Sequence, residues 1–155
     1  MAVTTAYRAA EGLIKISHEQ HSPITNLKLQ KLLYYAQAWH LVFFSGEPFF
    51  DDSIEAWVHG PVIPPIFRQY KEFRWKTITD VSVVLSQEIR THLDLVWKAY
   101  GKFDASQLER LTHSEQPWKE VRGELPIDAS SHRIIPFSLM RKYYSSLLNA
   151  ERNTQ

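Results

Sequence analysis

The stretch LKLQKLLYYAQAWHLVFF, residues 27–44, decides the fold of this 155-residue chain. Its main apolar stripe repeats every three or four residues, which is the period of an α-helix. A second stripe from Tyr35 to Val42 widens the apolar surface, so that little polar face is left after Gln30. A helix that is apolar on nearly all sides must be packed on several sides. We therefore expect this segment to form the central buried helix of the core.

The same periodicity predicts further helices around residues 27–44, and Pro, Gly and capping residues mark their ends. A small antiparallel hairpin is expected near 49–58, where Phe49-Phe50 and the segment 54–58 are aromatic and β-branched. The following segment, 59–65, is too rich in proline for a helix or a central strand. The expected helices cover residues 2–17, Thr25 or Asn26 to 44, about ten residues from Pro64 or Pro65, Ser86 to Tyr100, Asp104 to about 112, Ser114 to about 121, and 137–148, and Arg133 to Ile135 are expected to add one strand.

The predicted fold class is therefore mainly α, a single compact helical domain over residues 1–148 with a frayed polar tail over 149–155. Hydrophobic residues make up 44% of the chain and charged residues 23%, which is ordinary for a globular protein.

Eighteen basic and 17 acidic residues give a net charge of +1, which argues against a nucleic-acid or membrane partner. Because cysteine is absent, disulfides, iron–sulfur clusters and Cys-based zinc sites are excluded. No apolar stretch is long enough to span a bilayer, and the start has no signal-peptide pattern, so we expect a cytoplasmic protein.

The motifs of common enzymes are missing. No Gly-x-Ser-x-Gly elbow and no clustered glycines occur, and His18 and His21 are three residues apart rather than the four of a zinc-binding HExxH helix. We therefore expect no enzyme activity, no cofactor and no metal. One alternative is a metal-dependent hydrolase that uses His59 and His113 from loops, where function concentrates. Another is a DNA-binding regulator of its own operon, because helices 86–100 and 105–112 could form a helix-turn-helix.

Two lysines near the start of the central helix are unusual. Lys28 and Lys31 lie where the helix dipole is positive and cations are disfavoured. Either both side chains reach water or pair with a carboxylate such as Asp51 or Glu55, or they bind an acidic group of a partner.

Four segments of the chain carry a recognisable pattern, in this order: LKLQKLLYYA at 27–36, IEAWVHGPV at 54–62, LTHSEQPW at 111–118, and the pattern from Ile134 to Tyr144 that ends in paired tyrosines. Together they resemble the SocA-like proteins, the Panacea-domain antitoxins that are often described as phage-associated or GepA-like. The resemblance implies a mostly helical domain that neutralises a toxin by binding it directly, the toxin usually being encoded by an adjacent gene, often in a prophage. It also implies a possible AAA+ protease partner, since one branch of the family is a proteolytic adaptor that delivers its toxin to such a bacterial protease.

Two sets of residues are candidates for toxin binding. The first comes from the resembling segments: Trp57, His59, His113 and Trp118 either form a shared surface or simply build the scaffold. The second lies outside the expected core stripes, where aromatic and basic residues are typical anchors of a protein interface. Trp75 is the first of these to test, either as an anchor or as a packing contact under the segment 74–84. The other members of the second set are Arg68, Tyr70, Lys71 and Arg74.

Overall fold

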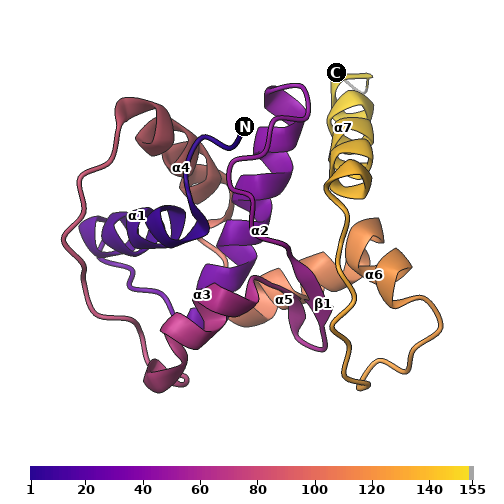
Figure 1. Ribbon diagram of the computed structural model, residues 1–155, viewed down its shortest axis with the longest axis horizontal. Helices are drawn as coiled ribbons and strands as arrows, with labels where there is room; N and C mark the ends of the chain where they lie inside the picture. The colour runs from indigo at the N-terminus through magenta and orange to yellow at the C-terminus, as the bar shows by residue number, and fades with distance from the viewer. Residues whose placement is uncertain (154–155) are drawn as a thin grey trace.

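The central helix α2 (Asn26–Phe43) lies in the middle of the domain, between α4 and α7, in the computed structural model (Figure 1). The structure describes residues 1–153, and these are mainly helical, as predicted. Helix α2 packs against five other α-helices, α1, α3, α4, α5 and α7, and against strand β2. The elements, in chain order, are α1 (Ala6–Glu19), α2, β1 (Glu55–Trp57), β2 (Gly60–Val62), α3 (Pro64–Gln69), the 3₁₀ helix η1 (Lys71–Phe73), α4 (Gln87–Tyr100), α5 (Ala105–Ser114), α6 (Gln116–Arg122) and α7 (Phe137–Asn153).

Burial of α2 confirms the prediction of a central helix. Leu29, Leu32 and Leu33 are completely buried, and even Tyr34 and Tyr35 expose 1% of their surface or less. Thr25 is the N-cap, since its hydroxyl accepts a hydrogen bond from the main-chain N–H of Lys28 over 3.2 Å. Burial of so many large side chains makes this helix the main source of hydrophobic stabilisation.

Three further N-caps were predicted, at Ser86, Asp104 and Ser114. The first two are confirmed and the third is wrong. Ser86 caps α4, and Asp104 forms a capping box with Gln107 at the start of α5. Ser114 was expected to begin the next helix, but it is the last residue of α5, and Glu115 takes the N-cap position of α6. Helix α1 begins at Ala6 rather than at residue 2, because the side chain of Thr5 caps it.

The C-terminal helix is longer than expected. Helix α7 continues through Asn153, so residues 149–153 are helical rather than a frayed tail, and residues 154–155 lie outside the described part of the chain. Ala150, Glu151 and Arg152 have high intrinsic helix propensity, which explains the continuation. Within residues 1–153, no helix combines the length and the apolar character that crossing a membrane requires.

The hairpin exists, and β1 lies within the expected segment 54–58, but the other expected strand, at Phe49-Phe50, is absent. Phe49 and Phe50 are fully buried and form no strand, because the side-chain amide of Gln37 on α2 binds the main chain of both. The chain pairs β1 with β2 instead, and Trp57 lies opposite Gly60 in the register. The proline-rich segment thus supplies an edge strand of a two-stranded sheet, in agreement with its exclusion as a central strand, although this strand was not predicted.

Pro61 is tolerated in β2 because the sheet is small and Pro61 lies opposite Ala56 without needing to donate a hydrogen bond. On the other side of β1, the main-chain N–H of Ala56 donates to the oxygen of Arg133 over 2.8 Å, and Ile134 forms a bridge to Glu55. The strand expected at 133–135 is thus reduced to a bridge. Helix α3 is also shorter than the expected ten residues, since it ends at Gln69 and η1 follows.

Candidate functional site

A buried cluster of tyrosines around one glutamate joins three of the four resembling segments. The carboxylate of Glu115 accepts a hydrogen bond from Tyr35 over 2.6 Å and one from Tyr144 over 2.9 Å, and the hydroxyl of Tyr34 lies 2.9 Å from that of Tyr144. Burial raises the pKa of Glu115, while the two tyrosine hydroxyls oppose the shift by binding the charged form. These residues connect α2, the α5–α6 junction and α7, so this part of the motif builds the scaffold.

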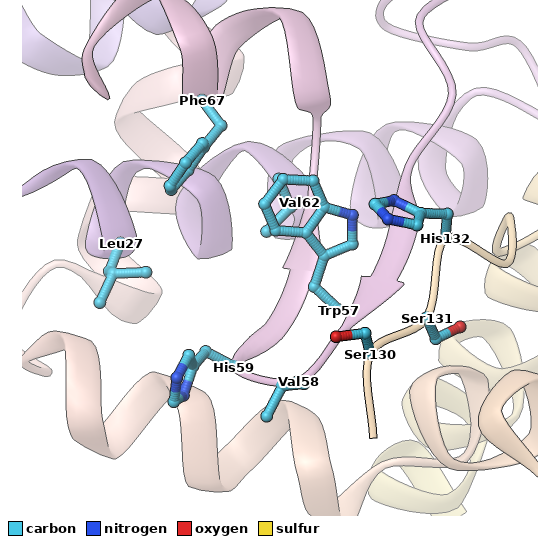
Figure 2. Close-up of a pocket in the computed structure, with 9 residues that line it drawn as sticks. All are labelled: Leu27, Trp57, Val58, His59, Val62, Phe67, Ser130, Ser131 and His132. Atoms are coloured by element: carbon cyan, nitrogen blue, oxygen red, sulfur yellow. The ribbon is translucent and has the colours of Figure 1, made fainter. Parts of the chain in front are cut away.

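An open apolar cleft lies on the outer face of the hairpin, next to α3. We name it the Trp57 cleft; its volume is about 450 Å³. Figure 2 shows the Trp57 indole between Phe67 and His132, with Val62 behind it. The rings of Trp57 and Phe67 meet edge to face with centroids 5.2 Å apart. The lining residues are Leu27, Trp57, Val58, His59, Val62, Phe67, Ser130, Ser131 and His132.

Two histidines stand at the rim of the Trp57 cleft, and each is held by a carboxylate. The Nδ1 atom of His59 lies 3.0 Å from Glu109, and that of His132 lies 3.0 Å from Glu55, which also accepts the Trp57 indole N–H over 2.9 Å. The two histidine side chains are 66% and 78% exposed. Within the described residues the Nε2 atoms make no hydrogen bond, so each ring has one nitrogen free to contact a partner.

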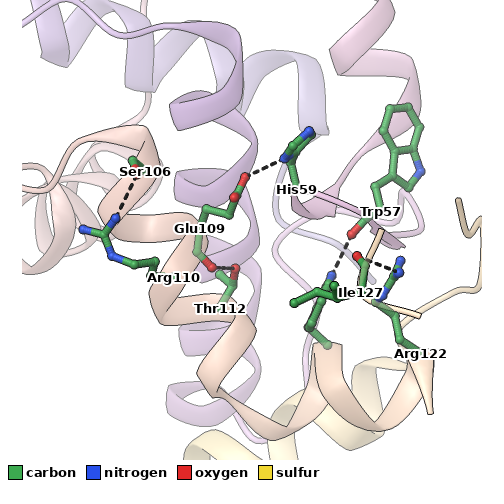
Figure 3. Close-up of polar contacts among 9 residues, drawn as sticks. Trp57, His59, Ser106, Glu109, Arg110, Thr112, Arg122 and Ile127 are labelled. Carbon is green, nitrogen blue, oxygen red and sulfur yellow. Dashed lines mark hydrogen bonds and ion pairs between the residues drawn. The ribbon is translucent and has the colours of Figure 1, made fainter. Parts of the chain in front are cut away.

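The loop that forms one wall of this cleft is held by Arg122, which is 98% buried. Its guanidinium donates to the main-chain oxygens of Pro126, Ile127 and Ala129, over 2.7 to 3.3 Å. Figure 3 shows Arg122 beside Ile127, to whose main-chain oxygen it donates. Charged groups are expensive to bury unless fully hydrogen-bonded, so this arrangement fixes the loop that leads to Ser130 and His132. The sequence gives no indication of this role, because Arg122 binds main-chain carbonyl groups, which every residue has.

Of the four motif residues, only Trp57 and His59 reach the cleft. Trp118 is 5% exposed and donates its indole N–H to the main-chain oxygen of Trp57 over 2.8 Å. The ring of His113 stacks on Trp118 with centroids 3.8 Å apart. Burial lowers the pKa of His113, which belongs to helix α5 and not to a loop. The alternative in which all four residues form one shared surface is therefore wrong. His113 and Trp118 pack beneath Trp57 and His59 and do not line the cleft.

Neither lysine of α2 fits the first alternative, in which the side chains reach water or pair with Asp51 or Glu55. Both residues are buried, and neither forms an ion pair within residues 1–153. Lys28 donates to the main-chain oxygen of Gly101 over 2.6 Å. Burial lowers the pKa of Lys28, and the nearby carboxylate of Asp104 opposes that shift.

Lys31 is 1% exposed, and its ammonium has no hydrogen-bond partner among the described residues. Burial lowers the pKa of Lys31 to about 8, and Glu109 opposes that shift. Gly60, at φ +106°, passes directly over this side chain: a Cβ there would lie 2.8 Å from Lys31 Cε. Glycine is thus required in β2 for two reasons, its backbone angle and the close approach.

The second candidate set is mostly on the surface. Arg68, Lys71 and Arg74 are exposed, and Trp75 exposes 74% of its surface, so it is not a packing contact under the following segment. Tyr70 is the exception, because it is 8% exposed and belongs to the core. It was therefore wrongly placed among the surface candidates.

The described residues do not assemble a site for either alternative to protein binding, the metal-dependent hydrolase or the DNA-binding regulator. Among residues 1–153 no group of three or more His, Cys, Asp or Glu side chains could hold a metal, and His59 and His113 serve separate contacts, with Glu109 and Trp118. Helix α4 packs on α1 and α2, whereas α5 packs on α2, α6 and β2. Both helices therefore serve the core.

Comparison with known proteins agrees with the resemblance drawn from the four segments. Antitoxin SocA of Caulobacter vibrioides (strain NA1000 / CB15N) is 32% identical over a 114-residue alignment that covers 64% of this chain and 60% of that relative. The chain thus spans about 60% of the length of the curated relative it matches. No solved structure matches. Residues 29–119, which contain most of α2, the hairpin and most of the residues that line the Trp57 cleft, match the family described as "Antitoxin SocA-like, Panacea domain", and the chain therefore belongs to this family.

Proposed function

We propose that this protein is an antitoxin that neutralises a cognate toxin by direct protein–protein binding, without catalysis, in a bacterial cytoplasm. The observation that carries the proposal is the family match over residues 29–119, together with the similarity to antitoxin SocA. The expected toxin is the product of an adjacent gene.

The Trp57 cleft supports this proposal physically. A stable interface covers about 800 Å² of each partner and depends on a few aromatic or arginine anchors in well-packed pockets. The cleft offers an aromatic floor from Trp57 and Phe67, an exposed apolar edge at Leu27, and hydrogen-bonding groups at the rim from His59 and His132. It can therefore bind an apolar side chain of the toxin and hydrogen-bond the groups around it.

Co-expression with the adjacent gene tests the proposal. The neighbour alone should arrest growth, co-expression of this chain should restore it, and the two proteins should co-purify. A neighbour that is harmless alone, or that still arrests growth when this chain is present, would contradict the proposal.

Substitution within the Trp57 cleft tests where the toxin binds. Phe67→Ala removes half of the aromatic floor and should weaken binding about 10-fold to 100-fold. Phe43→Ala is the matched control, because Phe43 is 50% exposed at the end of α2 and lies outside the lining of the Trp57 cleft. Circular dichroism on both variants checks that the fold is intact.

If this chain instead acts as an adaptor that delivers the toxin to a AAA+ protease, the toxin should be degraded. The half-life of the toxin would shorten when this chain is present, and neutralisation would fail in a strain that lacks the protease. Simple binding predicts that the toxin is neutralised while its level stays constant or rises.

A further inference from the structure

The most exposed aromatic side chain among the exposed large hydrophobic residues stands in a cluster of positive charge. Trp75 exposes 74% of its surface, whereas Tyr7, Phe43 and Phe44 expose between 46% and 50%. The segment 68–76, RQYKEFRWK, carries four basic residues and a single acidic one. We call its exposed basic and aromatic side chains, Arg68, Lys71, Arg74, Trp75 and Lys76, the basic turn.

None of these basic side chains is used inside the domain. Within residues 1–153, Arg68, Lys71, Arg74 and Lys76 make no side-chain hydrogen bond and no ion pair, whereas Arg90 and Arg122 make several. The excess of three positive charges in the segment is larger than the net charge of +1 of the whole chain, so the rest of the chain is slightly negative. The positive potential is therefore local to this turn.

The backbone of the basic turn is fixed, although its side chains are exposed. The main-chain N–H of Lys76 donates to Phe73 over 2.9 Å, and that of Ile78 donates to Ile24 over 2.8 Å. Arg74 has φ 55° and ψ −118°, a strained backbone conformation for a residue with a side chain. A rigid turn that displays tryptophan and arginine loses little conformational entropy on binding, which favours an interface anchor.

We propose that the basic turn docks onto a carboxylate-rich patch on the surface of the toxin protein, with Trp75 as the central anchor. This inference rests on the proposed function and adds the chemistry of the partner. Charge complementarity steers the encounter of two proteins and sets the register of the complex. A protein is favoured over nucleic acid because the positive charge covers only one turn, while the rest of the chain would repel a phosphate backbone.

The test uses the full-length chain and the purified product of the adjacent gene, with affinity measured by calorimetry at about 50 and 300 mM salt. The double substitution Arg74→Glu, Lys76→Glu should weaken binding about 100-fold at low salt and reduce the salt dependence. Trp75→Ala should weaken it about 10-fold at both salt concentrations. The double control Lys98→Glu, Lys119→Glu changes the net charge equally at two exposed sites elsewhere and should change affinity less than about threefold.

The outcomes separate this inference from the proposed function. If the wild-type chain neither binds nor neutralises the adjacent gene product, the proposed function fails, and the inference fails with it. If the wild-type chain binds and neutralises it but the basic-turn variants bind equally well, only the inference is overturned. A fluorescent 20-base-pair duplex is the third probe: loss of duplex binding in Trp75→Ala, with toxin binding intact, would assign the turn to nucleic acid instead.

Discussion

The indole N–H of Trp118 donates a hydrogen bond of 2.8 Å to the main-chain oxygen of Trp57. The two tryptophans belong to different segments of the family pattern, and the bond ties helix α6 to strand β1. On its other side, the guanidinium of Arg122 lies 4.9 Å from the centre of the Trp118 ring. Trp118 thus sets the position of the strand that presents the Trp57 indole to the cleft.

Trp118→Phe keeps an aromatic ring under His113 but removes this hydrogen bond. We expect the free energy of unfolding to fall by about 1 to 3 kcal/mol, because the oxygen of Trp57 loses its partner in a mostly buried place. Urea unfolding measures the change. Trp75→Phe is the matched control, since Trp75 is exposed and donates no hydrogen bond within residues 1–153, and it should unfold like the wild type.

Arg122→Met should loosen the wall of the Trp57 cleft. The substitution keeps much of the side-chain volume but leaves the carbonyl groups of Pro126, Ile127 and Ala129 without their donor. We expect faster hydrogen exchange over residues 124–132 and a loss of about 2 to 4 kcal/mol of stability. Arg110→Met is the control, because Arg110 is exposed and binds only Ser106. Unchanged exchange in the 124–132 segment would contradict the role given to Arg122.

The parts of the fold that depend on local pattern were predictable. Burial of α2 follows from its apolar periodicity, and the caps at Thr25, Ser86 and Asp104 follow from side-chain chemistry within three residues. The strand at Phe49 was wrong because Gln37, twelve residues earlier, binds its main chain. A side-chain contact to a main chain twelve residues away cannot be predicted from the local sequence pattern.

The candidate site was predictable only in part, for the same reason. Trp57 and His59 belong to one segment, but the cleft also needs Phe67, His132 and the loop held by Arg122. The burial of Lys31 was not predicted, because hydrophobic periodicity indicates which face of a helix a residue lies on but not whether another element covers that face. Strand β2 covers that face, and it had been treated as an irregular proline-rich segment.

The pair His40 and His92 should make the protein sensitive to acid. Both rings are buried, with centroids 5.0 Å apart, and burial lowers the pKa of each. When the pH falls below about 6.5, the unfolded chain takes up protons first, so the free energy of unfolding falls. His92→Gln removes one of these groups while keeping a donor for the oxygen of Ala36, and should reduce the loss between pH 7 and pH 5. Thr91→Gln, at an exposed position of the same helix, is the control, because it leaves both buried histidines in place and should keep the wild-type loss.

Lys31→Met tests the cost of the buried ammonium. The pKa of Lys31 is lowered from 10.5 to about 8, so between these values the unfolded chain binds more protons than the folded one. The free energy of unfolding of the wild type should therefore gain about 3 kcal/mol from this group between pH 8 and pH 10.5. Methionine fills a similar volume without charge, so the variant should be more stable than the wild type near pH 7.

That advantage should shrink as the pH rises through this window and vanish near pH 10.5. Urea unfolding of both proteins across the range measures the difference, in which the contributions of Tyr34, Tyr35 and Tyr144 cancel because both proteins contain them. Parallel pH profiles for the wild type and Lys31→Met would mean that the ammonium is satisfied in the folded protein.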